Sequence, residues 1–332
     1  MTKRFLRLPM VRAGIGLMLF FALMGTIGPW LCSTLLGLDP LTLDTANAGQ
    51  PPSAEHWLGT TSSGQDVFAR IVWGARGSLL VGLASGVIAT VLSVVIGIWA
   101  GFMGGWADRV LNTTTNLFLT MPSFAVTLII AGYVQKLDWL SVSIIIGIFE
   151  WPGGARRIRA QAMSLRGRDF TAALRTTGES RWRIISVEIS PHLNGVASSM
   201  FLTAFVYGVF TQASMAFLGI GDPETVSWGT EIAYAEGQNA LFRGMWWWFA
   251  PPGLAIALLG LSTALINFGI DEIVNPVLNS KQEVLVRTFL RRKSARQRAA
   301  AQSAPLQSAT AQSAEVQSSS GQSATMTQEM SR

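Results

Sequence analysis

The sequence predicts an all-α protein that crosses a lipid bilayer several times. Hydrophobic residues make up 49% of its 332 positions and charged residues only 13%, about half the charged fraction that is usual in soluble domains. Several stretches without any Asp, Glu, Lys or Arg exceed the roughly 20 residues that a helix needs to span a bilayer. Membrane-spanning helices therefore explain this composition better than a soluble core does.

Six segments are candidates for these helices. They cover residues 13–38, 77–107, 110–135, 139–149, 193–221 and 244–270. The polar start of the third, from Asn112 to Asn116, predicts a position near the headgroups or against a protein or water-filled surface. Residues 139–149 reach only about 17 Å at 1.5 Å per residue, so this span has to continue through Glu150 toward Ala155.

The first candidate could also be a cleavable signal, because basic residues precede it and Ala46-Asn47-Ala48 follows it. The apolar run is much longer than the roughly 7–15 residues of a signal core, and Ala46 lies well beyond its end. We therefore expect an uncleaved first span.

The distribution of Lys and Arg predicts the topology. With six spans, the N-terminal segment, Arg109, the loop 156–192 and the C-terminal tail share one side, and this side holds most of the basic residues. Basic residues concentrate on the cytoplasmic side of short loops. We therefore expect both termini in the cytoplasm, and we interpret the net charge of +6 as a topology signal rather than a nucleic-acid footprint.

This interpretation divides the chain into consecutive regions. They are a cytoplasmic N-terminal segment (1–12), a first transmembrane helix (13–38), an external loop (39–76), a five-helix core (77–278) that includes the cytoplasmic loop 156–192, a basic cytoplasmic segment (279–298) and a tail (299–332). Gln-Ser pairs recur every five residues in the tail, which favours disorder.

No residue pattern predicts chemistry in this chain. A Gly-x-x-x-x-Gly-Lys-Ser/Thr phosphate loop is absent, Cys32 is the sole cysteine, and the two histidines, His56 and His192, are far apart in the sequence. Glu150 is the one candidate for an ionisable residue within a span. We expect no metal, cofactor or catalytic site here, and we expect the energy for transport to come from another subunit. The alternatives are a self-sufficient carrier or channel, which would show broken-helix repeats or buried charges, and a membrane-bound enzyme.

The arginine-rich loop 156–192 carries the most informative pattern. A helix over about 155–166 is expected to precede a short helix in which Phe170, Ala173 and Leu174 lie at i, i+3 and i+4. Gly178 offers a left-handed stop, and a further helix runs from Ser180 until Pro191 breaks it. The pattern alone is also compatible with a basic amphipathic loop lying on anionic headgroups.

Residues 168–178 read Arg-Asp-Phe-Thr-Ala-Ala-Leu-Arg-Thr-Thr-Gly, and Ile189-Ser190-Pro191 follows. This element resembles the cytoplasmic "EAA" loop of permease subunits in ATP-binding-cassette (ABC) importers, especially those of the dipeptide/oligopeptide (peptide/nickel) family. Further similar segments follow in the family's order and extend the resemblance over roughly 6–278: 56–60, 64–67, 74–79, 213–221, 227–229 and 252–256. Ala172 replaces the loop's first Glu, Thr61 stands where Asp is usual and Gln65 where Arg is usual.

The resemblance implies a type I ABC importer permease with six transmembrane helices and a cytoplasmic coupling helix, in a bacterial inner membrane. It implies a second homologous permease, two ATPase subunits that bind ATP and Mg, and an external substrate-binding protein. Peptides are the commonest substrates of such permeases, but nickel chelates and other small solutes use the same type.

It also implies roles for particular residues. Those expected to dock the ATPase are Arg168, Asp169, Phe170, Ala172, Ala173, Arg175, Gly178 and Pro191, with Phe170 as the apolar anchor and Gly178 as the turn. Asp222, Glu224 and Trp228 are expected to contact the external binding protein. Trp246, Trp247 and Trp248 are interpreted as an interfacial aromatic belt.

Overall fold

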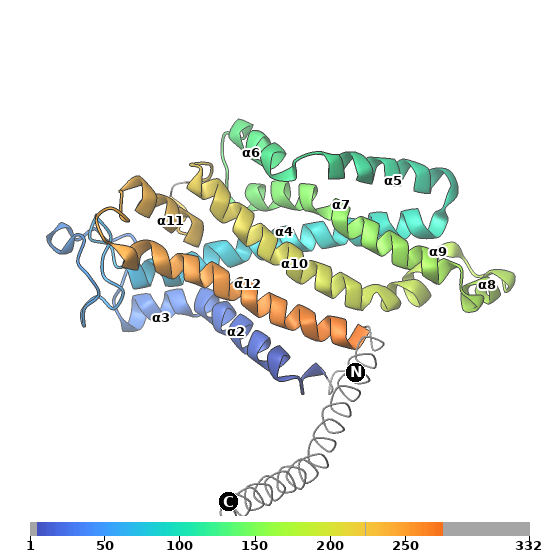
Figure 1. Ribbon diagram of the computed structural model, residues 1–332, viewed down its shortest axis with the longest axis horizontal. Helices are drawn as coiled ribbons and strands as arrows, with labels where there is room; N and C mark the ends of the chain where they lie inside the picture. Colours follow the sequence, from blue (N-terminus) through green and yellow to red (C-terminus); the bar gives the residue numbers. More distant parts are fainter. Residues whose placement is uncertain (1–4, 223, 275–332) are drawn as a thin grey trace, which may run out of the picture. The chain divides into compact units, whose positions relative to one another are not determined.

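The computed structural model describes residues 5–222 and 224–274, and all regular secondary structure within them is helical (Figure 1). The helices are α2 (Pro9–Thr26), α3 (Gly28–Leu35), η1 (Thr45–Asn47), α4 (Val67–Met103), α5 (Gly105–Thr120), α6 (Ser123–Tyr133), α7 (Trp139–Arg166), α8 (Asp169–Thr176), α9 (Arg181–Arg183), the π-helical η2 (Ile184–Ile189), α10 (Ser190–Phe217), α11 (Trp228–Gly237) and α12 (Trp246–Val274). The expected all-α class is confirmed. The segments expected at 279–298 and 299–332 lie outside the described residues.

Four of the described helices are long and apolar enough to cross a membrane: α2, α4, the continuous helix Arg181–Phe217, and α12 over Trp246–Glu272. The pair α5 and α6 gives a fifth span if it counts as one, although its two helices are bent by 84°. Helix α7 contains the expected span 139–149 and is long enough, but Glu150 and several arginines make it less apolar. A multi-pass membrane protein is thus confirmed, while the count of six spans stays a prediction.

Two expected boundaries differ from the structure. Helix α4 begins at Val67, inside the expected external loop, because Asp66 caps it by accepting a hydrogen bond from the Ala69 amide at 2.9 Å. The expected span begins at Gly77, after the charged residues Arg70 and Arg76, whereas in the structure Arg70 is buried in an ion pair and the helix runs through both residues. The first span divides into α2 and α3 at Ile27, just before Pro29, which has no N–H to donate.

The expected helices of the arginine-rich loop are also longer than predicted. Residues 155–166 continue α7 without a break. Pro191 does not end a helix, which corrects our expectation. The chain forms a π-helical turn just before it, in which the Ser190 amide donates to the Ile185 carbonyl, and α10 continues through the proline. The wider turn accommodates the missing proline donor.

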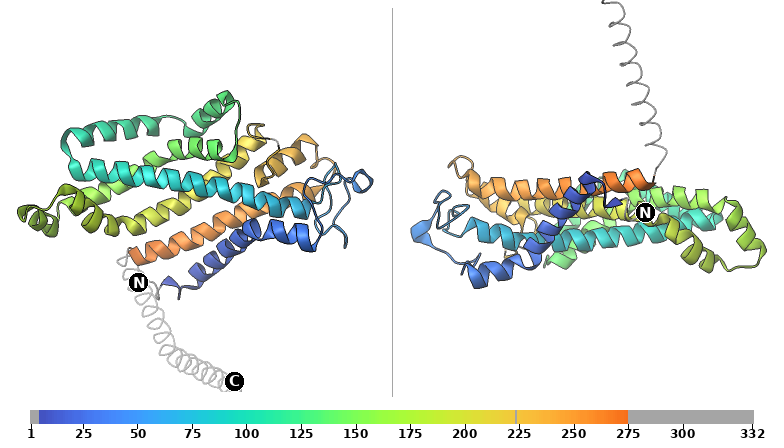
Figure 2. Two further views of the ribbon diagram at one scale, coloured as in Figure 1. Left: turned by 180° about the vertical axis from the view of Figure 1, so that it is seen from behind. Right: turned by 90° about the horizontal axis from the view of Figure 1, so that it is seen from below.

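Helix α4 contacts both α7 and α10, and its glycines make this close approach possible (Figures 1 and 2). On the α7 side, a Cβ atom on Gly97 would lie 2.7 Å from the Ala155 carbonyl oxygen, and one on Gly101 would lie 2.6 Å from that of Arg159. Gly97 and Gly101 form a Gly-x-x-x-Gly pair, a spacing that lets two membrane helices pack backbone to backbone.

The same device recurs on the α10 side of α4. A Cβ on Gly82 would lie 2.9 Å from the Phe205 carbonyl oxygen, and one on Gly86 would lie 3.1 Å from the Phe205 backbone. Gly208 of α10 faces back toward Ser85, and a Cβ there would clash with its hydroxyl. Two glycine pairs on one helix therefore hold α4, α7 and α10 together.

We predict that Gly97→Ala destabilises the protein by about 1–3 kcal/mol, the usual cost of an overpacked contact. The matched control is Gly153→Ala in α7, where a Cβ meets nothing within 4 Å and the better helix propensity of Ala makes the change neutral or stabilising. Unfolding temperatures of the two variants in detergent check this. Equal stability of both would contradict the glycine-mediated packing.

Candidate functional site

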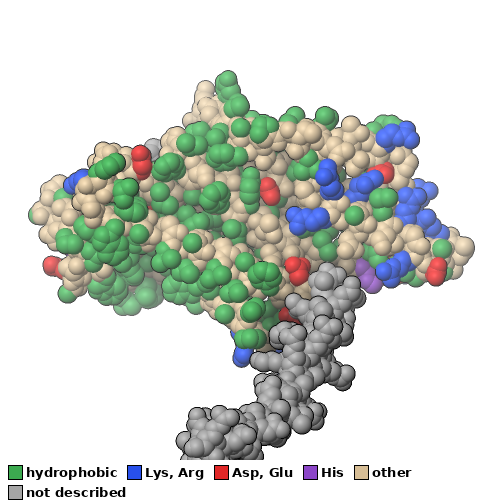
Figure 3. Space-filling model, viewed as in Figure 1, with side chains coloured by type: hydrophobic (Ala, Val, Ile, Leu, Met, Phe, Trp, Pro, Cys, Tyr) green, Lys and Arg blue, Asp and Glu red, His purple; other side chains and the backbone are tan. Residues whose placement is uncertain are grey.

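Basic side chains gather at one end of the helical bundle. Figure 3 shows Lys and Arg concentrated over α8, α9 and the adjoining ends of α5 and α7. We call this the arginine end. The segment 39–66 and α11 lie at the opposite end (Figure 1). The separation of charge expected from the sequence is therefore present in the part of the chain that the structure describes.

At the arginine end, α8 is fastened to the protein's own core. The buried Thr171 hydroxyl donates to the Leu165 carbonyl of α7 at 2.9 Å. Phe170 and Leu174 pack against a buried cluster formed by Ile98, Phe102, Ile158, Leu165, Ile184, Ile189, Leu193 and Met200. Phe170 is half-buried, so the expected apolar anchor for a partner faces inward and instead positions the helix.

The outward face of α8 consists of Asp169, Ala172, Ala173 and Thr176, which lie at i, i+3, i+4 and i+7 and are all exposed. Three of these side chains are small and uncharged, so a partner can approach the helix backbone closely. Ala172, which stands where the family has Glu, belongs to this face. The carboxylate that distinguishes the family would therefore point outward here.

Charged residues flank this face. Arg168 is exposed just before α8 begins, and the Arg175 guanidinium lies 5.1 Å from the centre of the Phe102 ring. Glu179 forms an ion pair with Arg183. Asp169 makes no ion pair within the described residues and is thus the carboxylate that remains available on the face.

Gly178 ends α8 as the sequence predicts. Its φ is +80°, and two hydrogen bonds close the turn, from the Gly178 amide to the Arg175 carbonyl (3.2 Å) and from the Glu179 amide to the Leu174 carbonyl (3.1 Å). This is the Schellman arrangement, which favours glycine at its left-handed position. A Cβ on Gly178 would meet nothing within 4 Å, so backbone conformation alone requires the glycine. Pro191 is exposed near the start of α10.

The opposite end is organised by a buried ion pair between Arg70 of α4 and Glu231 of α11, which are 5% and 1% exposed. The Arg70 Nε atom donates to both Glu231 oxygens at 2.8 Å, and its Nη1 donates to the Pro40 carbonyl at 2.9 Å. The Trp248 indole also donates to Glu231 at 3.4 Å. The sequence placed these charges in external loops and gave no signal that they pair.

Trp228 cannot be an external contact, because it is completely buried. Its indole nitrogen donates to the Ile71 carbonyl at 3.0 Å, and its backbone amide donates to the Ser78 hydroxyl at 3.1 Å. The Phe21 ring packs edge-on against it at 5.5 Å. Trp228 therefore fastens α11 to α4 and α2, which corrects our expectation for this residue.

The expected aromatic belt is also wrong for two of its three members. Trp247 and Trp248 are buried, and the Trp247 indole donates to the Thr60 carbonyl at 3.2 Å. Trp246, at 58% exposed, still fits an interfacial position.

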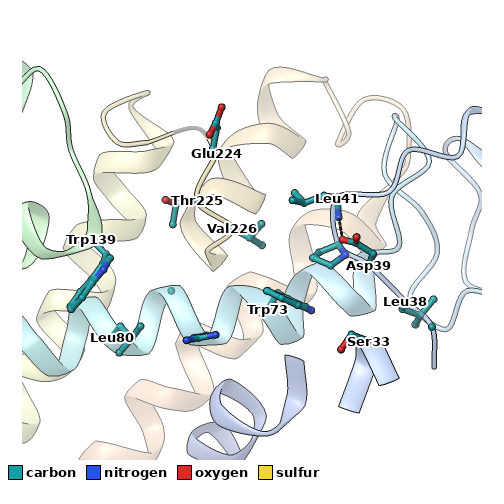
Figure 4. Close-up of a pocket in the computed structure, with 14 residues that line it drawn as sticks. Ser33, Leu38, Asp39, Leu41, Trp73, Leu80, Trp139, Glu224, Thr225 and Val226 are labelled. Carbon is teal, nitrogen blue, oxygen red and sulfur yellow. Dashed lines mark hydrogen bonds between the residues drawn. The ribbon is translucent and has the colours of Figure 1, made fainter. Parts of the chain in front are cut away.

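A pocket of about 840 Å³ opens at this end, between α3, α4, the start of α7 and residues 224–226 (Figure 4). Asp39, Arg76 and Glu224 are its charged lining residues. Glu224 is exposed at its edge. Asp222 instead binds its own turn, accepting hydrogen bonds from the Glu224 amide and the Thr225 hydroxyl, each at 2.9 Å.

Glu150 is half-buried and lines a small cavity with Thr90, Arg157 and Thr203. The volume of this cavity, about 20 Å³, leaves room for roughly one water molecule. Within the described residues, no three His, Cys, Asp or Glu side chains come close enough together to hold a metal ion.

Residues 93–278 match the family of binding-protein-dependent transport system inner membrane components. The chain belongs to this family. It is a transmembrane permease subunit of an ABC transport system. The segment that the family resemblance led us to expect as a coupling helix forms α8 in the structure.

Several curated proteins are similar over most of their length. A probable D,D-dipeptide transport system permease, DdpC of Escherichia coli, is 29% identical over 82% of this chain and 90% of its own. A putative peptide transport system permease of Brucella suis is 30% identical over 83% and 91%, and the oligopeptide permease OppC of Mycobacterium bovis is 32% identical over 70% and 79%. A chain of the methionine ABC transporter MetNI matches with a TM-score of 0.46 and 18% identity, over 64% of this chain and 96% of that one.

We predict that Glu231→Leu, which leaves Arg70 buried and unpaired, destabilises this permease by about 3–5 kcal/mol. The double variant Arg70→Met with Glu231→Leu should recover most of that loss, because no uncompensated charge remains. Thermal unfolding of the purified variants measures both effects. A double variant that is as unstable as the single one would show that the ion pair is not the cause.

Proposed function

We propose that this permease subunit imports peptides, together with a second homologous permease, two ATPase subunits that bind ATP and Mg, and an external binding protein. The relatives named as dipeptide, peptide and oligopeptide permeases support the substrate class. The family description supports the dependence on a binding protein. The observation that carries the proposal is α8. This short helix packs on the permease core through Phe170 and Leu174 and exposes a face of mostly small side chains.

The outward face of α8 is the proposed docking surface for one ATPase. Ala172 and Ala173 allow close contact, and Asp169 supplies a carboxylate in place of the one that the family carries at position 172. Arg168 and Arg175 flank the face and would complement acidic residues on the rim of a groove. Phe170 contributes from below by holding α8 against the core.

Movement of the ATPase would then reach the membrane spans through the contacts that Phe170 and Leu174 make with the buried cluster under α8. The Phe102 side chain of α4 belongs to the cluster under α8, and Arg175 lies over its ring. A closure of the ATPases on ATP would thus bias the bundle between outward- and inward-open states. A self-sufficient carrier is not favoured, because the chain belongs to a family of binding-protein-dependent permeases.

In this proposal the arginine end and both termini face the cytoplasm of a bacterial inner membrane, in line with the concentration of basic residues there. The opposite end then faces the binding protein. Its pocket, with Glu224 at the edge and Asp39 in the lining, is the candidate contact surface.

We predict that Gly178→Val abolishes uptake and co-purification of the ATPase while the chain still inserts into the membrane. Valine at a φ of +80° is strained by roughly 1–2 kcal/mol, which unwinds the end of α8. Gly178→Asn is the matched control, because Asn tolerates the left-handed conformation and the position has space for it. A mild-detergent pull-down followed by mass spectrometry identifies the partners.

Recovery of a homologous permease and ATPase subunits with the wild-type chain and with Gly178→Asn, but loss of the ATPase with Gly178→Val, is the expected result. Recovery of the wild-type chain alone, or as a homo-oligomer, would contradict the importer proposal. Normal uptake by Gly178→Val would contradict the role of α8.

We predict that cysteines at Asp222 and Ser164 react from opposite sides of the membrane. In a Cys32→Ala background, a membrane-impermeant thiol reagent added to intact cells should label Asp222→Cys. It should label Ser164→Cys, which is exposed near the arginine end of α7 and outside the docking face, only after permeabilisation. Labelling of both positions from the same side would overturn the proposed topology.

A further inference from the structure

The exposed side of α5 carries a row of polar residues. Arg109, Thr113, Asn116 and Thr120 lie at i, i+4, i+7 and i+11, so they share one helical face, and all four are exposed. We call this row the polar stripe. Thr115, on the other side of the helix, is only 5% exposed and marks the face that packs against the bundle.

A second, apolar row lies beside the polar stripe at the same depth. Trp106, Val110 and Leu117 lie at i, i+4 and i+11 and are 75%, 41% and 56% exposed. Thr113 of the polar stripe takes the i+7 position, so the two rows meet at Thr113. The two rows are neighbours on the helix surface but opposite in character. The exposed surface of α5 therefore changes from polar at Asn116 to apolar at Leu117.

The neighbouring helix α7 extends the polar stripe. Helix α5 runs alongside α7 rather than across the end of the bundle (Figures 1 and 2). The Arg156 side chain of α7 is exposed and donates a hydrogen bond to the Asn116 side-chain oxygen at 2.9 Å. Polar atoms of two helices thus meet on the same surface.

This arrangement does not suit a lipid-facing surface. Threonine alone would be tolerated in lipid, because Thr113 and Thr120 donate to carbonyls of their own helix at 2.8 Å. Asn116 and Arg156, which lie further along their helices than the arginine end, cannot be satisfied in that way, and exposing amide or guanidinium groups to hydrocarbon costs several kcal/mol. The apolar row, in contrast, is suited to lipid tails.

We propose that the polar stripe, extended by Arg156, lines the water-filled path of the transported solute in the half that this chain contributes. The solute class that fits is one with hydrogen-bonding amides and a free carboxylate, such as a peptide with an unblocked C-terminus. This assignment of the solute rests on the proposed function; the contact with water does not.

Charge supports a carboxylate-bearing solute. Arg109 forms no ion pair within the described residues, and Arg156 is bonded to a neutral amide. Asp108, the acidic residue of α5, is already paired with Arg159 at 2.6 Å. The stripe therefore presents uncompensated positive charge beside neutral hydrogen-bonding groups.

The test is the pattern of cysteine labelling in the complete complex, purified from its native membrane and reconstituted in lipid, in a Cys32→Ala background. Thr113→Cys and Asn116→Cys should react with a charged, water-soluble methanethiosulfonate reagent. Val110→Cys and Leu117→Cys, at matching depths on the apolar row, should react at least tenfold more slowly. A position at the headgroups would make all four react alike and would overturn the proposal.

A closed interface between two permeases is the other outcome that would overturn it. In that case Thr113→Cys and Asn116→Cys would react in the isolated chain but not in the nucleotide-free complex. Reaction of both in a complex that retains its ATPases supports both proposals together. If both react but no ATPase co-purifies, the water-facing stripe stands and the importer proposal fails.

The charge of the path is tested with two reagents on Thr113→Cys, one carrying a sulfonate and one a trimethylammonium group. Each reagent's rate constant with Thr113→Cys is divided by its rate constant with a small thiol free in solution. After this normalisation, the sulfonate reagent should react several-fold faster than the trimethylammonium reagent. Arg109→Gln should reduce this preference while leaving the labelling pattern unchanged. Equal normalised rates, or a preference for the cation, would overturn the assignment of a carboxylate-bearing solute.

Discussion

The close approach of α4 to α7 and α10 is the contact on which the rest of the structure depends. In a membrane, helix association draws little on the hydrophobic effect, so helices associate through packing and hydrogen bonds. The pairs Gly82/Gly86 and Gly97/Gly101 remove the side chains that would otherwise separate α4 from its neighbours. Longer side chains at Gly97 and Gly101 would move α7, and with it the base of α8, whereas longer side chains at Gly82 and Gly86 would move α10.

Helix α4 also connects the two ends of the bundle. Near its start, Arg70 joins Glu231 of α11 and the carbonyl of Pro40. Near its end, Phe102 lies in the cluster on which Phe170 and Leu174 rest. The cluster under α8 and the ion pair at the opposite end therefore share one helix, which is the connection that the proposed coupling requires.

Most of the membrane spans and the turn at Gly178 were predictable from the local sequence. Hydropathy placed most of the spans, and Gly178 was identified as a left-handed stop because that conformation is a property of a single residue and its turn. The Gly-x-x-x-Gly pairs were also visible in the sequence, but spacing alone does not reveal which helix packs against each pair.

The errors arose where a residue's environment depends on distant partners. The family resemblance implies a surface role for Trp228, yet its indole donates to the Ile71 carbonyl, 157 positions away. Arg70 and Glu231 lie 161 positions apart, and nothing in the sequence indicates that they pair inside the protein. Pro191 was expected to break a helix, since the sequence does not show that a π-helical turn absorbs its missing donor.

The most direct test of the central claim is a distance measurement between two spin labels in the assembled complex. One label is attached at Thr177→Cys, at the C-terminal end of α8 and outside the four residues of its docking face, and the other at Arg76→Cys on the far part of α4. If α8, α7 and α4 move as one unit, a single narrow distance distribution should remain unchanged between the nucleotide-free and ATP-trapped states. A shift of several ångströms, or a second population, would show that α8 moves independently of α4 and would contradict the proposed route of coupling.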